Sequence, residues 1–146
     1  MHPDSTLDRA SSPVDTPPPA DPALRAIAAA DAQASPALLA VLASDLSPRV
    51  RYAAVRHPAL PPRAMLDAAR AGDASTCEML GANPAVPAAV IRLLASHVAA
   101  EVRAAVARHP RIDLATLERL TTDGSAMVRA VAAAILERRI AGSALA

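Results

Sequence analysis

The stretch Val50 to Pro58, which reads VRYAAVRHP, returns along the chain at a fixed interval. Val102 to Pro110 reads VRAAVARHP, and Val128 to Leu136 opens a further copy as VRAVAAAIL. Between them, Thr76 to Pro84 reads TCEMLGANP, a diverged copy that keeps the final polar residue and proline. The copies begin at positions 50, 76, 102 and 128, so the period is 26 residues without insertions. A fixed period of this size predicts a stacked repeat architecture.

Each repeat reads as two short helices separated by a turn. In the second repeat, Ser47 is the expected N-cap and Pro48 the first-turn proline of the first helix. That helix must end near His57, because Pro58 disfavours the helical conformation in the residue before it. The pair Pro61–Pro62 then starts a second helix. The same signals recur in the later repeats, so we expect two helices in each.

The composition predicts an all-α protein whose helices approach closely. Of 146 residues, 39 are Ala, one is Tyr, and none is Phe or Trp, so few bulky rings can separate the helices. We expect an all-α solenoid of about four and a half two-helix repeats in residues 22–146. The predicted repeats are 22–47, 48–73, 74–99 and 100–125, with a partial repeat at 126–146 whose helix runs from Ala126 to about Ile140.

Residues 1–21 differ from the repeats in composition. They are rich in Pro, Ser and Asp and carry a net charge of −3, whereas the remaining chain has 14 Arg against 10 acidic residues. Such a segment cannot bury enough apolar surface to fold, so we expect a disordered, proline-rich tail. We found neither a signal peptide nor an apolar stretch of the length a membrane helix needs, which favours a cytoplasmic location.

The repeat cycle resembles the variant leucine-rich repeat family, whose architecture is related to HEAT and armadillo repeats. Residues 42 to 66 carry the resemblance best, through Leu42, Ala43, Asp45, Ser47, Val50, Arg51, Pro58, Pro61 and Met65. The resemblance covers about 22 to 140 and implies a right-handed superhelix of paired short helices that serves as an interaction module. Some members carry an N-terminal cysteine-rich iron–sulfur segment. This chain has only Cys77, so no cluster is expected.

The strongest candidate for function is a column of arginines. Arg25, Arg51, Arg103 and Arg129 share one repeat position, which Cys77 interrupts. Because packed helices lie ~8–10 Å apart, the column would form a ladder of guanidinium groups that could bind phosphates or acidic side chains. Alternatively, each Arg joins its repeat to the preceding loop. Asp45 precedes Arg51 by six residues, and Asp123 precedes Arg129 by six, so this interpretation predicts Asp–Arg pairs across the N-terminus of the first helix.

A second group of cations lies where the first helices should end. It contains Arg56, His57, Arg108 and His109, with Arg63, Arg111 and Arg92 nearby. A basic binding strip is one interpretation, and helix capping at the negative end of the helix dipole is the other. The two histidines lie two repeats apart, or ~16–20 Å at the usual helix spacing, which is too far to share a metal ion.

No catalytic constellation, metal-ligand spacing or glycine-rich phosphate loop occurs in the sequence, so we expect neither an enzyme nor a cofactor. The sequence favours a non-catalytic scaffold that binds a protein partner on one face of the solenoid. The candidate contact residues are Arg51, Arg56, His57, Arg63, Arg103, Arg108, His109, Arg111 and Arg129. The alternative is a protein that binds the nucleic-acid backbone through the arginine column. Self-association stays open, and no membrane partner is expected.

Overall fold

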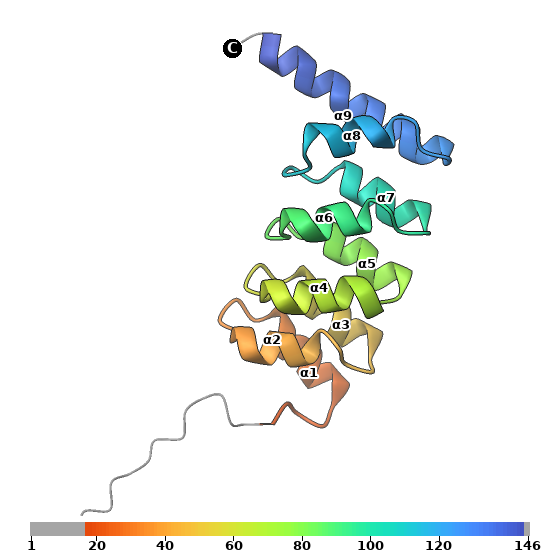
Figure 1. Cartoon of the computed structure of the whole chain (residues 1–146). Helices are drawn as coiled ribbons and strands as arrows, with labels where there is room; N and C mark the ends of the chain where they lie inside the picture. The colour runs from red at the N-terminus through yellow and green to blue at the C-terminus, as the bar shows by residue number, and fades with distance from the viewer. Residues whose placement is uncertain (1–16, 145–146) are drawn as a thin grey trace, which may run out of the picture.

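The computed structural model describes residues 17–144, and these form nine α-helices and no strand (Figure 1). The first helices of the repeats are α1 (Pro22–Ala30), α3 (Pro48–Arg56), α5 (Ala74–Gly81), α7 (Ala100–Ala107) and α9 (Ala126–Ala144). The second helices are α2 (Pro36–Leu42), α4 (Pro62–Ala71), α6 (Ala88–Leu94) and α8 (Leu114–Leu120). Within each group, successive helices begin 26 residues apart. The prediction of an all-α, two-helix repeat architecture is confirmed.

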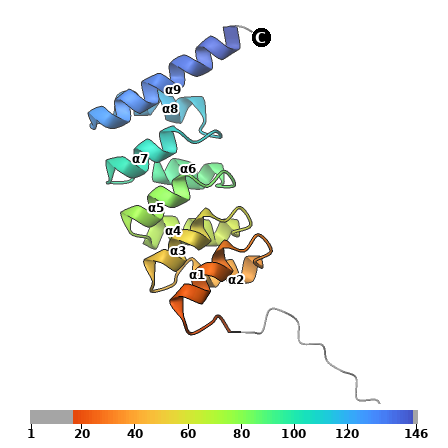
Figure 2. The ribbon, with the colours of Figure 1, turned by 180° about the vertical axis from the view of Figure 1, so that it is seen from behind.

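The helices form two layers. The first helices stack directly on one another, α1 on α3 and so on to α9, and Figure 2 shows this layer from its exposed side. The second helices form the layer nearer the viewer in Figure 1. Loops within the repeats line one edge of the stack, and loops between the repeats line the opposite edge. The fold is therefore an α-solenoid, while the right-handed sense of its superhelix stays a prediction.

The core between the layers is built from columns of equivalent side chains. Val50, Val102 and Val128 are fully buried on the first helices. Equivalent side chains of the second helices are buried as well: Met65, Ala68, Ile91, Leu94, Leu117 and Leu120. In the turns between the two helices of a repeat, Leu60, Val86 and Ile112 fill one equivalent position. Each large aliphatic side chain buried in this way stabilises the fold by about 1.5–3 kcal/mol.

Aspartate and serine side chains fix where several helices begin. The Asp113 carboxylate accepts from the Thr116 N–H at 2.7 Å, and Asp73 accepts from the Thr76 N–H at 2.8 Å. Ser47 occupies the predicted N-cap position of α3, although its hydroxyl makes no cap hydrogen bond. Its N–H instead donates to the Asp45 carboxylate at 2.8 Å, so the preceding loop organises this helix start.

At each end of the stack, an arginine side chain bonds a main-chain carbonyl of an adjacent segment. The last helix extends beyond the predicted Ile140, and Arg139 on it donates to the Ile112 carbonyl at 2.8 Å. At the other end, the Arg25 guanidinium donates to the Pro19 carbonyl at 3.0 Å, and Asp21 caps α1. Residues 1–16 of the predicted tail lie outside the described residues. Among the helices of residues 17–144, none combines the length and apolar character of a membrane-spanning helix.

Candidate functional site

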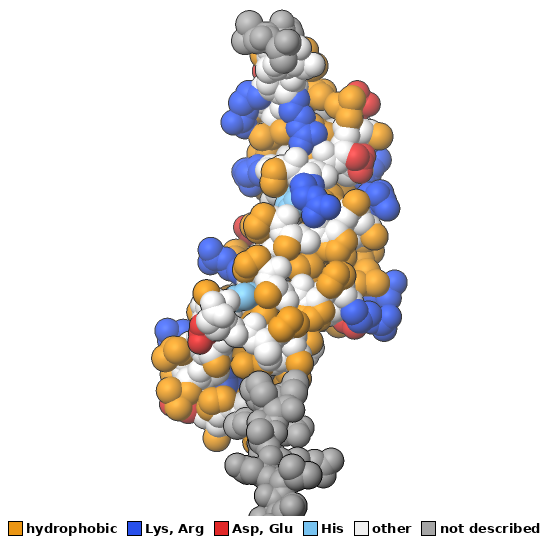
Figure 3. Space-filling model, turned by 90° about the vertical axis from the view of Figure 1, so that its left-hand side faces the viewer, with side chains coloured by type: hydrophobic (Ala, Val, Ile, Leu, Met, Phe, Trp, Pro, Cys, Tyr) orange, Lys and Arg blue, Asp and Glu red, His pale blue; other side chains and the backbone are white. Residues whose placement is uncertain are grey.

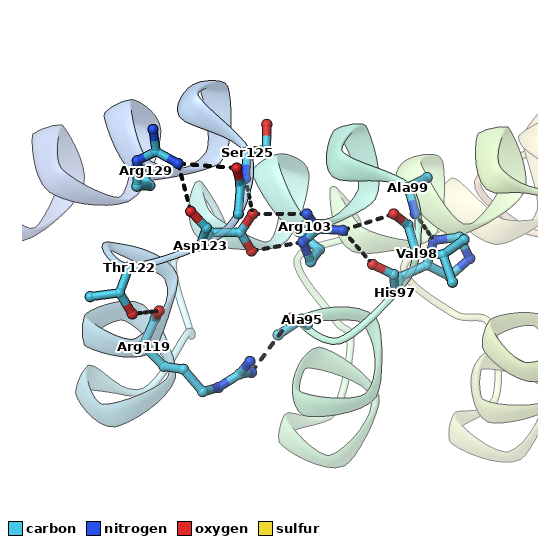
Figure 4. Close-up of polar contacts among 11 residues, drawn as sticks. Ala95, His97, Val98, Ala99, Arg103, Arg119, Thr122, Asp123, Ser125 and Arg129 are labelled. Atoms are coloured by element: carbon cyan, nitrogen blue, oxygen red, sulfur yellow. Dashed lines mark hydrogen bonds and ion pairs between the residues drawn. The ribbon is translucent and has the colours of Figure 1, made fainter.

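The arginine column lies along the edge formed by the loops between repeats (Figure 4). Every arginine of the column points its Nη1 group into the loop before its own helix, where it donates to two successive main-chain carbonyls. Arg51 donates to Asp45 O (2.8 Å) and Leu46 O (3.0 Å), Arg103 to His97 O (2.6 Å) and Val98 O (2.9 Å), and Arg129 to Asp123 O (2.8 Å) and Gly124 O (3.1 Å). Each guanidinium group thus fixes the loop that leads into its helix.

The remaining donors of the guanidinium groups bind carboxylates at the end of the same repeat, in the loop that leads to the next repeat. Arg103 Nε and Nη2 form a two-pronged pair with Asp123, each at 2.8 Å, and Arg25 binds Asp45 in the same way at 2.7 and 3.1 Å. Arg51 makes a single contact of 2.6 Å with Asp73. Three of the four arginines therefore join two repeats, and the arrangement favours a joining role for the column over a free guanidinium ladder.

This geometry corrects the expected partners. Asp45 pairs with Arg25, twenty residues before it, and Asp123 pairs with Arg103, so the predicted Asp45–Arg51 and Asp123–Arg129 side-chain pairs do not form. The reason is local. Each Asp sits in a tight loop whose main-chain carbonyl faces the following Arg, while its carboxylate faces the Arg on the first helix of its own repeat.

The ion pairs shift the pKa values of their members. The hydrogen bond from Arg25 is the main cause that lowers the pKa of Asp45, and the bond from Arg103 does the same for Asp123. The pKa of Asp73 falls to about 2, first because the Thr76 N–H donates to it and next because Arg51 does. Conversely, the pKa of Arg103 is raised by its bond to Asp123. All three carboxylates are ionised at neutral pH, as their ion pairs with the arginines require. The contact between the first helix of one repeat and the first helix and leading loop of the next is called here a joint.

The joint between the third and fourth repeats is built differently. Cys77 replaces the arginine there, and His97 stands where Asp45 and Asp123 stand in their repeats. The Cys77 thiol is buried, which raises its pKa, and lies against the carbonyls of Ala69 and Gly72 at 3.7 Å. His97 Nδ1 accepts from the Ala99 N–H at 3.1 Å, so it keeps the loop-shaping role of the aspartates without their charge. This joint therefore lacks both the guanidinium donor and the carboxylate acceptor of the other joints.

The two predicted histidines belong to a second column, on the edge formed by the loops within repeats. The Nε2 atom of His57 bonds the Asp31 carbonyl at 3.0 Å, Asn83 Nδ2 donates to the His57 carbonyl at 3.0 Å, and His109 Nε2 bonds the Asn83 carbonyl at 2.9 Å. Each bond spans 26 residues, one repeat. Since Nδ1 of His57 and of His109 accepts a main-chain N–H two residues later, Nε2 carries the proton. Both rings are buried and joined to neighbouring repeats, so they offer no free surface.

The other predicted contact residues lie on the surface. Arg56, Arg108 and Arg111 are exposed, and Arg63 is exposed but pairs with Asp67 on the next turn of α4 at 3.0 Å. Figure 3 looks onto the edge of the within-repeat loops and shows arginine side chains spaced among apolar ones. Of the predicted set, Arg56 and Arg108 occupy the same repeat position at the ends of α3 and α7.

The exposed side of α3, α5 and α7, called here the first-helix face, carries residues that the sequence analysis did not single out. One hollow of about 350 Å³ is lined by Arg49, Tyr52, Ala53 and Arg56. Another, of about 270 Å³, is lined by Glu78, Met79, Gly81, Ala82, Ala105, Arg108, His109 and Pro110. The signal was present in the period, because the equivalent positions 53, 79 and 105 are all half-buried and lie between the buried stripe and the polar side.

The described residues contain no group of three His, Cys, Asp or Glu side chains placed to hold a metal ion. Comparison with protein families matches residues 100–125 to the leucine rich repeat variant family. This match falls on the fourth repeat and confirms the resemblance that the sequence pattern predicts. Comparison with curated proteins and with solved structures finds no match to the chain.

Proposed function

We propose that this chain, which carries a leucine rich repeat variant at residues 100–125, is a non-catalytic scaffold that binds a protein segment along its first-helix face. Repeats of paired short helices create one extended surface rather than a deep pocket. Surfaces of this kind suit a partner that lies across several repeats, each of which contributes a few contacts.

The observation that carries the proposal is the pair of hollows on one continuous face. Tyr52 lies in one of them and Met79 in the other, and each is half-buried with part of its apolar surface exposed. Both hollows are shallow and near or below the lower end of the ~300–1,000 Å³ that small-molecule sites occupy. Tyr and Met are enriched at protein interfaces, where a hollow of this size accepts a single partner side chain. The face thus resembles a surface for a peptide or a helix.

The charge of the first-helix face indicates the kind of partner segment it suits. Arg49, Arg56 and Arg108 are exposed at the borders of the hollows, and no ion pair binds them within the described residues. Glu78 is the acidic residue that lines the second hollow. The excess of cations favours a partner segment in which acidic side chains flank apolar ones, because complementary charge sets orientation and speeds association.

The alternative of nucleic-acid binding draws less support. It rests on the arginine column, whose donors are already engaged by carbonyls and carboxylates. The repeat region has 14 arginines against 10 acidic residues, a modest excess for a protein that binds phosphate backbones. The first-helix face also offers a single aromatic ring, Tyr52, for stacking bases.

The test is affinity capture from native lysate with nuclease, using two matched double variants. R56E/R108E reverses two exposed arginines at the ends of first helices, and R70E/R92E reverses two exposed arginines in the last turns of second helices. We expect a discrete protein that the wild type and R70E/R92E retain and R56E/R108E loses. Equal retention by both variants would place the binding surface elsewhere, and recovery of nucleic acid instead of protein would favour the alternative.

A further inference from the structure

The two ends of the described stack carry the two halves of the joint that links neighbouring repeats. We propose that a second copy of this chain docks head to tail, so that α1 of one copy packs on α9 of the other as each first helix packs on the one before it. This association uses neither hollow of the first-helix face and is independent of the protein partner proposed above.

The N-terminal end supplies uncovered apolar side chains. Leu24 on α1 is 52% exposed, whereas its equivalents Val50, Val102 and Val128 are completely buried against the preceding repeat. Ile27, one turn further along α1, is 66% exposed. The equivalents of Ile27, which are Ala53, Met79 and Ala105, are half-buried on the first-helix face, so Leu24 is the side chain that lacks the cover found at internal joints. Covering Leu24 would remove apolar surface from water, as it does for its equivalents at the internal joints.

The C-terminal end supplies the surface that such side chains pack against. At internal joints this surface centres on one repeat position of the first helix. Ala29, Val55 and Ala107 are completely buried there, and a Cβ on their equivalent Gly81 would lie 3.3 Å from the Val106 side chain of α7. The equivalent on α9 is Ala133, which is only half-buried. An alanine at this position allows close approach of a neighbouring helix, so the C-terminal end presents the other half of the same joint.

Charges at the two ends complete the match. Arg129 donates Nη1 to its own loop as the other column members do, but the Nε and Nη2 groups that bind Asp123 in Arg103 have no acceptor for Arg129 among residues 17–144. At the opposite end Asp21 caps α1 in the position that Asp73 holds on α5, two periods later. In the docked pair, Asp21 of the second copy stands to Arg129 as Asp73 stands to Arg51.

A second copy fits this surface better than an unrelated protein does, because both halves of the joint belong to one chain and are already matched in size, spacing and charge. The contact is heterologous, with different surfaces on the two copies, and each added copy presents the same free ends again. Such contacts build open chains rather than closed dimers. We therefore expect assemblies that lengthen with protein concentration.

Sedimentation velocity over a wide concentration range tests the proposal with three single variants. L24E blocks the N-terminal end, A133E blocks the C-terminal end, and L46E changes a loop residue that is 96% exposed away from both ends. We expect wild type and L46E to assemble alike, and each end variant to associate at least tenfold more weakly. An equimolar mixture of L24E and A133E retains one intact joint, formed by α9 of L24E and α1 of A133E, so it should give a dimer and nothing larger.

Circular dichroism of all variants checks that they are folded, which is expected because Leu24 and Leu46 are exposed and Ala133 is half-buried. A wild type that stays monomeric at every concentration would overturn the proposal. So would assembly of either end variant at wild-type strength, or a mixture that contains only monomers, because these outcomes exclude a joint between α9 and α1. Loss of the protein partner in R56E/R108E would leave all of these results unaffected.

Discussion

The guanidinium group of Arg103 makes four hydrogen bonds, two to carbonyls of the loop before its helix and two to Asp123 in the loop that leads to the next repeat. It therefore holds three segments together while leaving its own side chain only 16% exposed. No lysine could take this role, because a single ammonium group lacks the planar fork that reaches carboxylate and carbonyls at once.

Truncation of Arg103 tests this role through stability. We expect R103A to lower the free energy of unfolding by about 2–3 kcal/mol, because hydrogen bonds between charged groups are lost and loop carbonyls lose their donor. R103K should retain only part of that stability. Urea denaturation measures the effect. The matched control is R56A, an exposed arginine outside the column, which should change stability by less than about 0.5 kcal/mol. Equal stability of R103A and R56A would refute the joining role.

The column of His57, Asn83 and His109 makes a second prediction, about interchangeable residues. Asn83 and His109 each accept an N–H two residues later and donate to a carbonyl one repeat earlier. We therefore expect H109N to retain much of the stability that H109A loses, which is about 1–3 kcal/mol for the polar groups left buried and unpaired. Thermal melting compares the two variants. If they melt at the same temperature, the hydrogen bonds of His109 do not stabilise the stack.

At the scale of helices and loops, the joint between the third and fourth repeats lacks its ion pair because Cys77 and His97 replace Arg and Asp. Restoring both residues should restore the pair. We expect C77R alone to gain little, because its guanidinium finds no carboxylate at position 97. The double variant C77R/H97D should exceed the sum of the single changes by a coupling energy of about 0.5–2 kcal/mol, as directly contacting residues do.

A double-mutant cycle in urea measures this coupling. Pairing H97D with C77A provides the control, because alanine fills the Cys77 position without supplying a donor. A coupling energy of zero in the Arg–Asp cycle would mean that the loop at this joint does not place residue 97 as the other loops place Asp45 and Asp123.

At the scale of the whole molecule, the ion pairs predict how stability changes with pH. The folded-state pKa values of Asp45, Asp73 and Asp123 lie below their ordinary value, so these groups contribute stability that is complete above the unfolded pKa of about 3.9. That stability is lost as the pH falls through the folded values, about 2 for Asp73. We expect a marked decline in the urea midpoint between pH 4 and pH 2.

Removal of one titrating group makes this test specific. D73N should be less stable than the wild type at pH 7 and should lose less stability between pH 4 and pH 2, because the amide does not titrate. A decline as steep as that of the wild type would show that other groups control the acid unfolding.

The sequence predicted the fold well because the period itself carries the information. Val50, Val102 and Val128 mark one buried column, and prolines mark the helix starts, so helix positions followed without knowledge of any contact. The ion-pair partners at the joints could not be predicted from the sequence in the same way. Asp45 is nearer to Arg51 in sequence than to Arg25, and the spacing alone does not reveal that its carbonyl faces one and its carboxylate the other.

The candidate site was predicted less well for a related reason. Most arginines and histidines that stood out by repetition are repeated because each joint needs them, as Arg103 and His109 show. Tyr52 and Met79 on the first-helix face vary between repeats, and a search for recurring residues passes over them. Residues that serve the stack repeat with it, whereas residues that serve a partner need not.

The missing ion pair also has a mechanical meaning. Neighbouring repeats are pinned at two edges, by the arginine column on one side and by the column of His57, Asn83 and His109, continued by Arg139, on the other. Between the third and fourth repeats the first edge lacks the ion pair and retains the bonds from Arg103 to the His97 and Val98 carbonyls, with a long contact of 3.5 Å from Arg119 to the Ala95 carbonyl. That boundary is held less firmly along the arginine edge than along the histidine edge. When the stack is pulled from its two ends, we expect it to open first between the third and fourth repeats and to divide there into two halves.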